Sequence, residues 1–127
     1  MIGLKSIKKF NCSKVLLHDA ARPNTSTKLI KKIIRKLRTN KAVIPAVQVK
    51  DSVKRIDKKT YLFNLERKNL LLSQTPQGFN FKDILKLHNK YKNFSITDDA
   101  ALFINDKRKI RIVPGEEGNI KITNAQD

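Results

Sequence analysis

The first half of the chain carries an apolar pattern that predicts a strand, a helix and a second strand. Residues 14–18 form a short apolar run typical of a buried strand. Hydroxyl residues at 25–27 can cap a helix whose apolar positions recur at helical spacing: Leu29, Ile30, Ile33, Ile34 and Leu37. Residues 42–49 are predicted as the second strand, where Pro45 indicates an edge, a bulge or an irregular stretch. This order predicts a βαβ unit with parallel pairing and a right-handed crossover.

The second half predicts a hairpin followed by shorter elements. Residues 51–65 alternate apolar and basic positions around a turn at 57–59, which indicates an extended hairpin with too little apolar surface to be stable alone. Such an arm needs a partner to pack against. Residues 70–72 are apolar, and the stretch SQTPQGF that follows is predicted as a loop.

Capping residues place two further helices in the second half. Asn80 can cap a helix that runs to about residue 91, and Thr97 can cap a short helix that runs to Phe103. Residues 110–113 and 119–123 are predicted as the last two strands. Together the elements predict an α/β layer fold with an inserted β-hairpin arm.

The composition suits one soluble domain with a strong positive charge. The chain has 127 residues, of which 39% are hydrophobic and 31% charged, a balance typical of a globular protein. The formal net charge of +17 points to a polyanion partner such as nucleic acid, a nucleotide or a phosphorylated metabolite. A composition biased toward Lys, Ile and Asn explains the same charge without any partner, and both explanations stay open from the charge alone.

No feature of the sequence indicates a membrane or an oxidising compartment. No apolar run approaches the roughly 20 residues of a membrane span. The first residues contain no apolar segment of the kind that a secretory signal has. The single cysteine, Cys12, cannot form an internal disulfide, which fits a reducing compartment. We therefore expect a cytoplasmic protein without membrane contact.

The residues that could carry chemistry gather in HDAARP, residues 18–23. Asp19 follows a strand, where ligands of open α/β sheets bind, and a carboxylate there can hold Mg²⁺. Arg22 offers a planar guanidinium that suits a phosphate, although an Asp–Arg pair in a loop also serves as a structural salt bridge. One cysteine and two histidines cannot form a structural zinc site, and neither GxGxxG nor GxxxxGK[ST] is present.

Five stretches resemble the 2-C-methyl-D-erythritol 4-phosphate cytidylyltransferases, and they occur in the family's order. They are VLLHDAARP, PAVQVKDSVKR, LERKNLLLSQTPQGF, ITDDAALF and GEEGNIKIT, and they cover about residues 14–127. GLKSI near the start resembles the helix that precedes the first of these stretches. The resemblance implies an incomplete Rossmann-like nucleotidyltransferase sheet with an inserted β-hairpin arm at about residues 51–68. It also implies a single partial domain over residues 1–127, because the family's Gly-rich nucleotide loop precedes these motifs.

The resemblance also implies a role for individual residues. Asp19 would hold Mg²⁺ and contact CTP, and Lys121 would lie near the α-phosphate of CTP as the second catalytic residue. The remaining implied residues bind the sugar phosphate: Ala20, Arg22, Asp51, Ser52, Arg67, Thr75 and Thr97. Ser52 stands where the family has threonine, so the hydroxyl is kept and the methyl is lost. Arg67 and Ser52 would complete the site of a second subunit, because the family's arm reaches into its neighbour.

The implied activity is cytidylyl transfer from CTP to 2-C-methyl-D-erythritol 4-phosphate in non-mevalonate isoprenoid biosynthesis, with Mg²⁺ as cofactor. The implied partners are the two substrates and a second copy of the chain, without nucleic acid or membrane. Some family members are fused to a 2-C-methyl-D-erythritol 2,4-cyclodiphosphate synthase, and the sequence leaves that open here. We expect these 127 residues to be inactive by themselves. Two alternatives remain: a basic nucleic-acid-binding module and a non-catalytic dimerisation relic.

Overall fold

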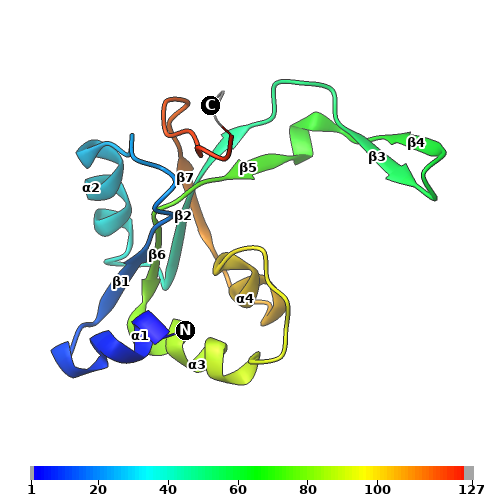
Figure 1. Cartoon of the computed structure of the whole chain (residues 1–127). Helices are drawn as coiled ribbons and strands as arrows, with labels where there is room; N and C mark the ends of the chain where they lie inside the picture. Colours follow the sequence, from blue (N-terminus) through cyan, green and yellow to red (C-terminus); the bar gives the residue numbers. More distant parts are fainter. Residues whose placement is uncertain (1, 125–127) are drawn as a thin grey trace.

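The computed structural model describes residues 2–124, so residue 1 and residues 125–127 of the predicted domain lie outside the described part. The chain forms a sheet with helices on both faces and a long hairpin that projects from one side (Figure 1). The predicted α/β class with an inserted hairpin is confirmed. The helical elements are α1 (Ile2–Ser6), η1 (Ile7–Phe10), α2 (Thr27–Lys36), η2 (Arg67–Asn69), α3 (Phe81–Lys90) and α4 (Ala100–Asn105). The strands are β1 (Lys14–Leu17), β2 (Ala42–Gln48), β3 (Lys54–Asp57), β4 (Tyr61–Asn64), β5 (Leu71–Ser73), β6 (Gln77–Asn80) and β7 (Arg111–Pro114).

The main sheet is mixed, and its topology corrects the predicted βαβ pairing. The strands follow the order β1-β6-β2-β5, and β7 pairs with β2. β6 is antiparallel to both β1 and β2, so β1 and β2 run in the same direction but are not neighbours. The parallel pair is β2 with β7. Strand–helix–strand order alone could not show that a strand from later in the chain would insert between the first two.

Two apolar cores lie on opposite faces of the sheet, and neighbouring residues of β2 divide between them. Ala42 belongs to the core that α1, α3 and α4 cover, whereas Val43 belongs to the core under α2. The α2 core consists of Leu29, Ile33, Leu37, Val43 and Val113, with Leu16 packed against it. Because successive strand residues point to opposite faces, one strand supplies both cores. Ile34 of the predicted helix stripe is 47% exposed, so the buried stripe is narrower than the apolar pattern.

A close approach between α2 and the sheet depends on Gly78 of β6. A Cβ built there would lie 2.6 Å from Leu37 Cδ1 and 2.7 Å from Ile33 Cγ2. The neighbouring Phe79 points to the other face and stacks on Phe103 of α4, with ring centroids 5.3 Å apart. β6 therefore presents the Phe79 ring to the layer of α4 and only the side-chain-free backbone of Gly78 to α2, which packs directly against it.

The prediction that Pro45 marks an edge or irregular stretch is wrong, because Pro45 is buried in the middle of the central strand. Its carbonyl accepts a hydrogen bond from the Gln74 amide at 2.9 Å. In an extended strand the nitrogen and the carbonyl of one residue point to the same side, so the missing N–H faces the junction between β6 and β5. Pairing with β7 on the other side remains intact, which explains how the strand accommodates proline.

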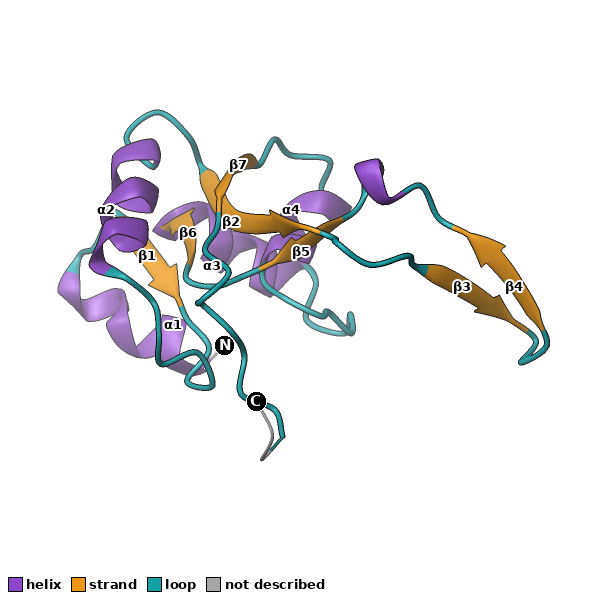
Figure 2. Ribbon diagram, turned by 90° about the horizontal axis from the view of Figure 1, so that it is seen from above, coloured by secondary structure: helices purple, strands orange, loops and turns teal. Residues whose placement is uncertain are grey.

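The predicted arm is a separate two-stranded sheet, β3–β4, that extends away from the rest of the chain (Figure 2). Its turn contains Lys58 and Lys59, both with positive φ. Every residue of the two strands is exposed, as the scarcity of apolar surface predicted. No helix among residues 2–124 has the length and apolar character needed to cross a membrane.

Two further predictions about strands are wrong. The predicted loop 73–79 contains β6, because Gln77, Gly78 and Phe79 enter the sheet directly after a cis Thr75–Pro76 bond. The predicted strand 119–123 is not a strand, and a backbone hydrogen bond from Ile122 N–H to Ala21 C=O at 2.8 Å ties it to the β1–α2 loop. Both stretches matter for the site, since they carry residues that line it.

Candidate functional site

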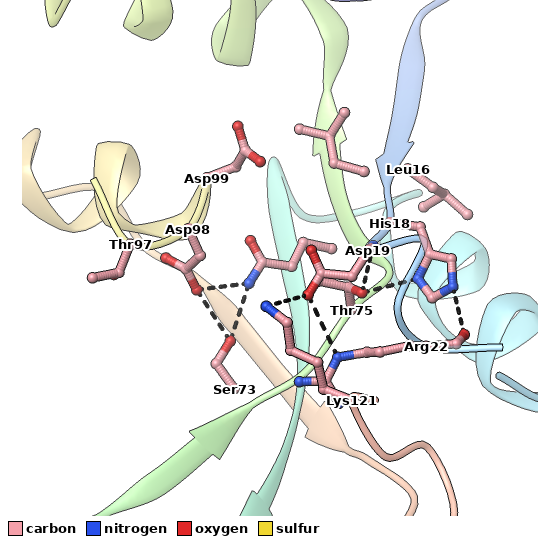
Figure 3. Close-up of a pocket in the computed structure, with 12 residues that line it drawn as sticks. Leu16, His18, Asp19, Arg22, Ser73, Thr75, Thr97, Asp98, Asp99 and Lys121 are labelled. Atoms are coloured by element: carbon pink, nitrogen blue, oxygen red, sulfur yellow. Dashed lines mark hydrogen bonds and ion pairs between the residues drawn. The ribbon is translucent and has the colours of Figure 1, made fainter. Parts of the chain in front are cut away.

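One pocket collects five residues that the sequence analysis had placed far apart in the chain. It has a volume of about 620 Å³ and lies at the end of β1 (Figure 3). The predicted residues that line it are Asp19, Arg22, Thr75, Thr97 and Lys121. Those side chains come from the β1–α2 loop, the β5–β6 bend, the segment before α4 and the segment after β7. The fold therefore brings these five residues together at one rim of the sheet.

Asp19 is the centre of charge in the pocket. Its Oδ2 lies 3.1 Å from Lys121 Nζ and 3.7 Å from Arg22 Nε. The Arg22 side chain is only 12% exposed, whereas Asp19 and Lys121 are 39% and 48% exposed. The Arg22 Nε–H is buried and has no hydrogen-bond acceptor among the described residues. Asp19 faces both cations, whereas Asp98 and Asp99 line the same pocket, so the positive charge that could meet an anion is local to Lys121 and Arg22.

Thr75 and His18 hold the β1–α2 loop beside the β5–β6 bend. Thr75 Oγ1 accepts a hydrogen bond from the Asp19 amide at 3.0 Å and lies 2.9 Å from His18 Nδ1. His18 Nε2 lies 3.1 Å from the Arg22 carbonyl, which can only accept. His18 Nε2 can therefore donate to that carbonyl, and Nδ1 makes a hydrogen bond with the Thr75 hydroxyl. Thr75 thus links His18 to the Asp19 backbone.

The segment before α4 is anchored by its acids, and this corrects the predicted cap. Thr97 does not cap the helix; Asp98 Oδ1 accepts from the Ala101 amide at 3.0 Å instead. Asp98 Oδ2 accepts from the Gln77 side-chain amide at 2.8 Å and from the Ser73 hydroxyl at 3.2 Å. Both oxygens of Asp98 are thus engaged by protein donors, and α4 begins at Ala100, two residues later than a cap at Thr97 predicted. Thr97 is left exposed on the pocket wall.

Four of the predicted residues lie outside this pocket. Ala20 is exposed and lines a smaller hollow on the other side of the same loop. Asp51 lines an adjoining pocket of about 400 Å³ that shares Arg22, Ser73 and Lys121 with the first. Ser52 and Arg67 are exposed at the base of the arm, where the Arg67 guanidinium donates to the Lys50 carbonyl. Within one subunit, the structure brings neither Ser52 nor Arg67 to the pocket.

Sequence reasoning missed three buried polar residues that support the pocket. Gln74, Gln77 and Asn119 are 5%, 2% and 0% exposed, and each bonds to segments that carry pocket residues. Amide side chains give no periodic signal, and both glutamines fall in the stretch that was predicted as a loop. The only available signal was that each amide lies inside one of the five stretches that resemble the family.

The pocket can accommodate a divalent cation through Asp19. No group of three or more acidic, histidine or cysteine side chains among residues 2–124 could hold a metal ion. Mg²⁺, however, is commonly bound by one or two carboxylates together with substrate phosphate oxygens. The Asp19 Oδ1 has no protein partner in the described part of the chain, so a single carboxylate oxygen is available. The residues present fit that mode of binding.

The fold and the pocket define a class of protein. An α/β sheet that gathers acids, two cations and hydroxyls at one rim is typical of the nucleotide-binding α/β proteins. Comparison with known proteins gives the family: the family described as 2-C-methyl-D-erythritol 4-phosphate cytidylyltransferase, IspD, matches residues 1–127, and the chain belongs to it.

Individual relatives agree with this assignment. The chain is 48% identical to the bifunctional enzyme IspD/IspF of Pelagibacter ubique (strain HTCC1062) over 98% of its length, which is 33% of that relative. It is 41% identical to the 2-C-methyl-D-erythritol 4-phosphate cytidylyltransferase of Prochlorococcus marinus (strain MIT 9515), over 98% of this chain and 57% of that protein. The chain therefore spans between a third and three fifths of these relatives.

A solved structure confirms the fold. The 4-diphosphocytidyl-2C-methyl-D-erythritol synthase from Anaerococcus prevotii DSM 20548 superposes with a TM-score of 0.89 at 42% identity. The superposition covers 98% of this chain and 59% of that one. The predicted fold class and the family resemblance are both confirmed by these matches.

Proposed function

We propose that this chain forms part of an enzyme that transfers cytidylyl from CTP to 2-C-methyl-D-erythritol 4-phosphate. Family membership supports the reaction, and the meeting of Asp19, Arg22, Thr75, Thr97 and Lys121 at one pocket is the observation that carries the proposal. The products would be CDP-methylerythritol and pyrophosphate. The expectation that these 127 residues are inactive by themselves stays a prediction.

The reaction needs charge stabilisation and alignment, not an enzyme nucleophile. A phosphate oxygen of the sugar phosphate attacks the α-phosphorus of CTP, a new P–O bond forms, and the bond to the pyrophosphate oxygen breaks. Lys121 would neutralise negative charge that develops on the α-phosphoryl oxygens. Arg22 would hold the phosphate of the sugar, because its buried Nε–H still lacks an acceptor among the described residues. Alignment of two polyanions supplies the rest of the rate enhancement.

The hydroxyl groups of the pocket would select the sugar. Thr75 Oγ1 accepts from the Asp19 amide and makes a hydrogen bond with His18 Nδ1, and its remaining hydrogen-bonding capacity would serve a hydroxyl of the sugar. Thr97 is exposed and free to rotate toward the ligand. Asp51, in the adjoining pocket, offers a further acceptor. Ala20 lies in the β1–α2 loop between Asp19 and Arg22.

Asp19 would hold Mg²⁺ through its carboxylate, together with oxygens of the triphosphate. The metal would supply charge neutralisation and alignment of the phosphates. Lys121 shares Asp19 Oδ2 at 3.1 Å, so the same carboxylate would fix the lysine and the metal relative to each other.

We also infer that two copies of the chain associate through the β3–β4 arm. Four large apolar or aromatic side chains on its strands are 44–66% exposed: Ile56, Tyr61, Leu62 and Phe63. Ser52 and Arg67 lie at its base, and in a dimer they would complete the partner's sugar-phosphate pocket.

A cytoplasmic location stays a prediction from the sequence, and fractionation of cells tests it.

The decisive experiment measures pyrophosphate release from CTP with the full-length protein that contains this chain. We expect turnover that requires both the sugar phosphate and Mg²⁺, and no turnover with the sugar lacking its phosphate. An inactive but dimeric protein would favour the dimerisation relic. Binding to duplex DNA or RNA that weakens steeply with salt, without cytidylyl transfer, would favour the nucleic-acid module.

A further inference from the structure

The segment that carries Lys121 has no secondary structure of its own, although it lines the pocket. Residues 115–123 form neither helix nor strand. A lysine on such a segment keeps its position only if other contacts fix the backbone on either side. Two buried amide side chains, Asn119 and Gln74, supply five such hydrogen bonds on the N-terminal side of Lys121, and the Ile122 amide bonds to the Ala21 carbonyl on the other side.

Asn119 joins three segments that meet at the pocket. It is fully buried, and its Nδ2 donates to the Thr75 carbonyl at 2.8 Å, while its Oδ1 accepts from the Thr25 hydroxyl at 2.8 Å. The Thr75 carbonyl can only accept, so the orientation of the amide is fixed. Its backbone carbonyl accepts from Arg22 Nη1 at 2.6 Å. Asn119, two positions before Lys121, thus contacts both the loop that holds Arg22 and the bend that holds Thr75.

Gln74 fixes the other end of the same segment. Its Oε1 accepts from the Glu116 amide at 3.1 Å, and its Nε2 donates to the Glu116 carbonyl at 2.8 Å and the Asn119 carbonyl at 3.3 Å. The side-chain amide therefore pairs with the backbone as a neighbouring strand would. Buried polar networks of this kind hold one arrangement, because each unsatisfied group would be costly.

We propose that Asn119 and Gln74 are positioning residues that set Lys121 and Arg22 against the ligand phosphates. The catalytic part of this proposal rests on the proposed function, because that function assigns Lys121 its role. The hydrogen bonds of Asn119 and Gln74 do not depend on it. The Asn119 side chain holds the segment that places Lys121 Nζ beside Asp19, and its carbonyl orients the Arg22 guanidinium. Neither amide lines the 620 Å³ pocket that holds Asp19, so toward that pocket both act through their neighbours, although both border the adjoining pocket.

The test is a double-mutant cycle in the full-length protein that contains this chain. Asn119→Asp keeps the acceptor for Thr25 but removes the donor to the Thr75 carbonyl and sets a carboxylate against it. We expect Asn119→Asp to lower kcat/KM for CTP by roughly tenfold or more in the wild-type background. In the Lys121→Ala background the same change should cost clearly less, because the lysine that it displaces is already gone and only the effect through Arg22 remains. Asn93→Asp, the same chemical change on an exposed residue, serves as the control.

Equal losses in both backgrounds would overturn the proposal, because a merely structural defect acts independently of Lys121. If Asn119→Asp does not fold, Thr25→Val decides, since it removes the 2.8 Å donor to Asn119 Oδ1 together with two longer contacts, to His18 and the Arg22 carbonyl, and should show smaller coupling of the same sign. If the wild-type protein does not turn over CTP, the proposed function fails and hydrogen exchange replaces the assay. The Ile122 amide should then exchange faster in Thr25→Val, with β2 amides unchanged, and unchanged Ile122 exchange would refute the positioning role.

Discussion

At the scale of the residue, Lys121 carries positive charge where it adds little to stability. Its ion pair with Asp19 is open to solvent on both sides, with side chains 48% and 39% exposed. Exposed pairs of this kind contribute about 0–1 kcal/mol to the free energy of unfolding. The main effect of Lys121 is therefore the positive electrostatic potential that its ammonium group adds to the pocket.

Replacement of Lys121 by alanine should separate activity from stability. We expect kcat for cytidylyl transfer to fall on the order of 10²–10³-fold, as when one preorganised charge-stabilising donor is lost. The free energy of unfolding should change by less than about 1 kcal/mol. Chemical denaturation and the pyrophosphate assay measure the two quantities, and Lys109→Ala, an exposed lysine away from the pocket, provides the control. A large loss of stability in parallel with activity would assign Lys121 a structural role instead.

Gly115 marks the close contact between the β7–Lys121 segment and Gln74. A Cβ at Gly115 would lie 2.3 Å from Gln74 Oε1 and 3.2 Å from the carbonyl carbon of Ala46. Gly115→Ala should therefore displace the glutamine amide and destabilise the fold by about 1–3 kcal/mol. Gly118→Ala is the matched control, because nothing lies within 4 Å of its Cβ position. Thermal unfolding of the two variants measures the difference, and equal melting temperatures would contradict the crowding argument.

Residue chemistry alone revealed only part of the pocket. Asp19 and Arg22 could be predicted because an acid and a guanidinium follow a buried strand. Thr75, Thr97 and Lys121 have no local signal, since a threonine in a loop and one lysine among many are common, and the family resemblance alone pointed to them. Gln74 and Asn119 were missed because their importance depends on backbone groups far away in sequence.

At the scale of the element, helices were predictable where a cap and an apolar period coincide. Ser26 caps α2 through the Leu29 amide, and Asn80 caps α3 through the Asp83 amide, each at the expected place. Local sequence does not determine which strands pair, and for that reason β6 and the 119–123 segment were predicted wrongly. Residues 77–79 look like a loop because Pro76 precedes them, and tertiary contacts recruit them into the sheet.

An ion cluster connects the end of α3 with the turn after α4. The Asp106 carboxylate contacts the Lys90 ammonium and lies 2.6 Å from Arg108 Nε, and Tyr91 adds a hydrogen bond at 3.0 Å. The hydrogen bond from Lys90, followed by that from Arg108, holds the pKa of Asp106 well below its usual value of about 4. The same contact raises the pKa of Lys90.

The depressed pKa of Asp106 predicts an acid-sensitive contribution to stability. A carboxyl group whose pKa is lowered in the folded state stabilises the fold at pH values above its unfolded-state pKa, which is about 4. That stabilisation is lost as the pH falls toward the folded-state pKa. The free energy of unfolding should therefore fall below about pH 4 less steeply in Asp106→Asn than in the wild type. Urea denaturation between pH 2 and 7 measures both slopes. Asp57→Asn, on the exposed arm, is the control, and parallel curves for Asp106→Asn and wild type would contradict the assignment.

At the scale of the whole molecule, the arm is an apolar surface without a partner in the described chain. Ile56 and Leu62 are cross-strand neighbours on one face of the hairpin and are 62% and 66% exposed. On the other face the Arg55 guanidinium lies 5.0 Å from the centroid of the Phe63 ring. A two-stranded hairpin of this kind is marginal in water, so its order depends on burial against another surface.

The net charge of +17 modulates that association. Two copies of a strongly basic chain repel each other, and salt screens the repulsion over a Debye length of about 10 Å at 0.1 M. Apolar burial in the arm should therefore produce a dimer whose stability rises with ionic strength, which is opposite to the behaviour of nucleic-acid binding. The direction of the salt effect distinguishes the two interpretations of the charge.

Leu62→Asp should convert the dimer to monomer, because an unpaired carboxylate in an apolar interface is costly to bury. Sedimentation velocity at about 0.1 and 0.5 M salt should give a dimer for the wild type, with a larger dimer fraction at the higher salt concentration. Lys58→Ser, at the tip of the same arm, keeps the apolar face and should leave the dimer intact. Since Ser52 and Arg67 would serve the partner's pocket, Leu62→Asp should also raise KM for the sugar phosphate while leaving the fold unchanged. A wild type that sediments as a monomer at every salt and protein concentration would remove the arm from the proposed site.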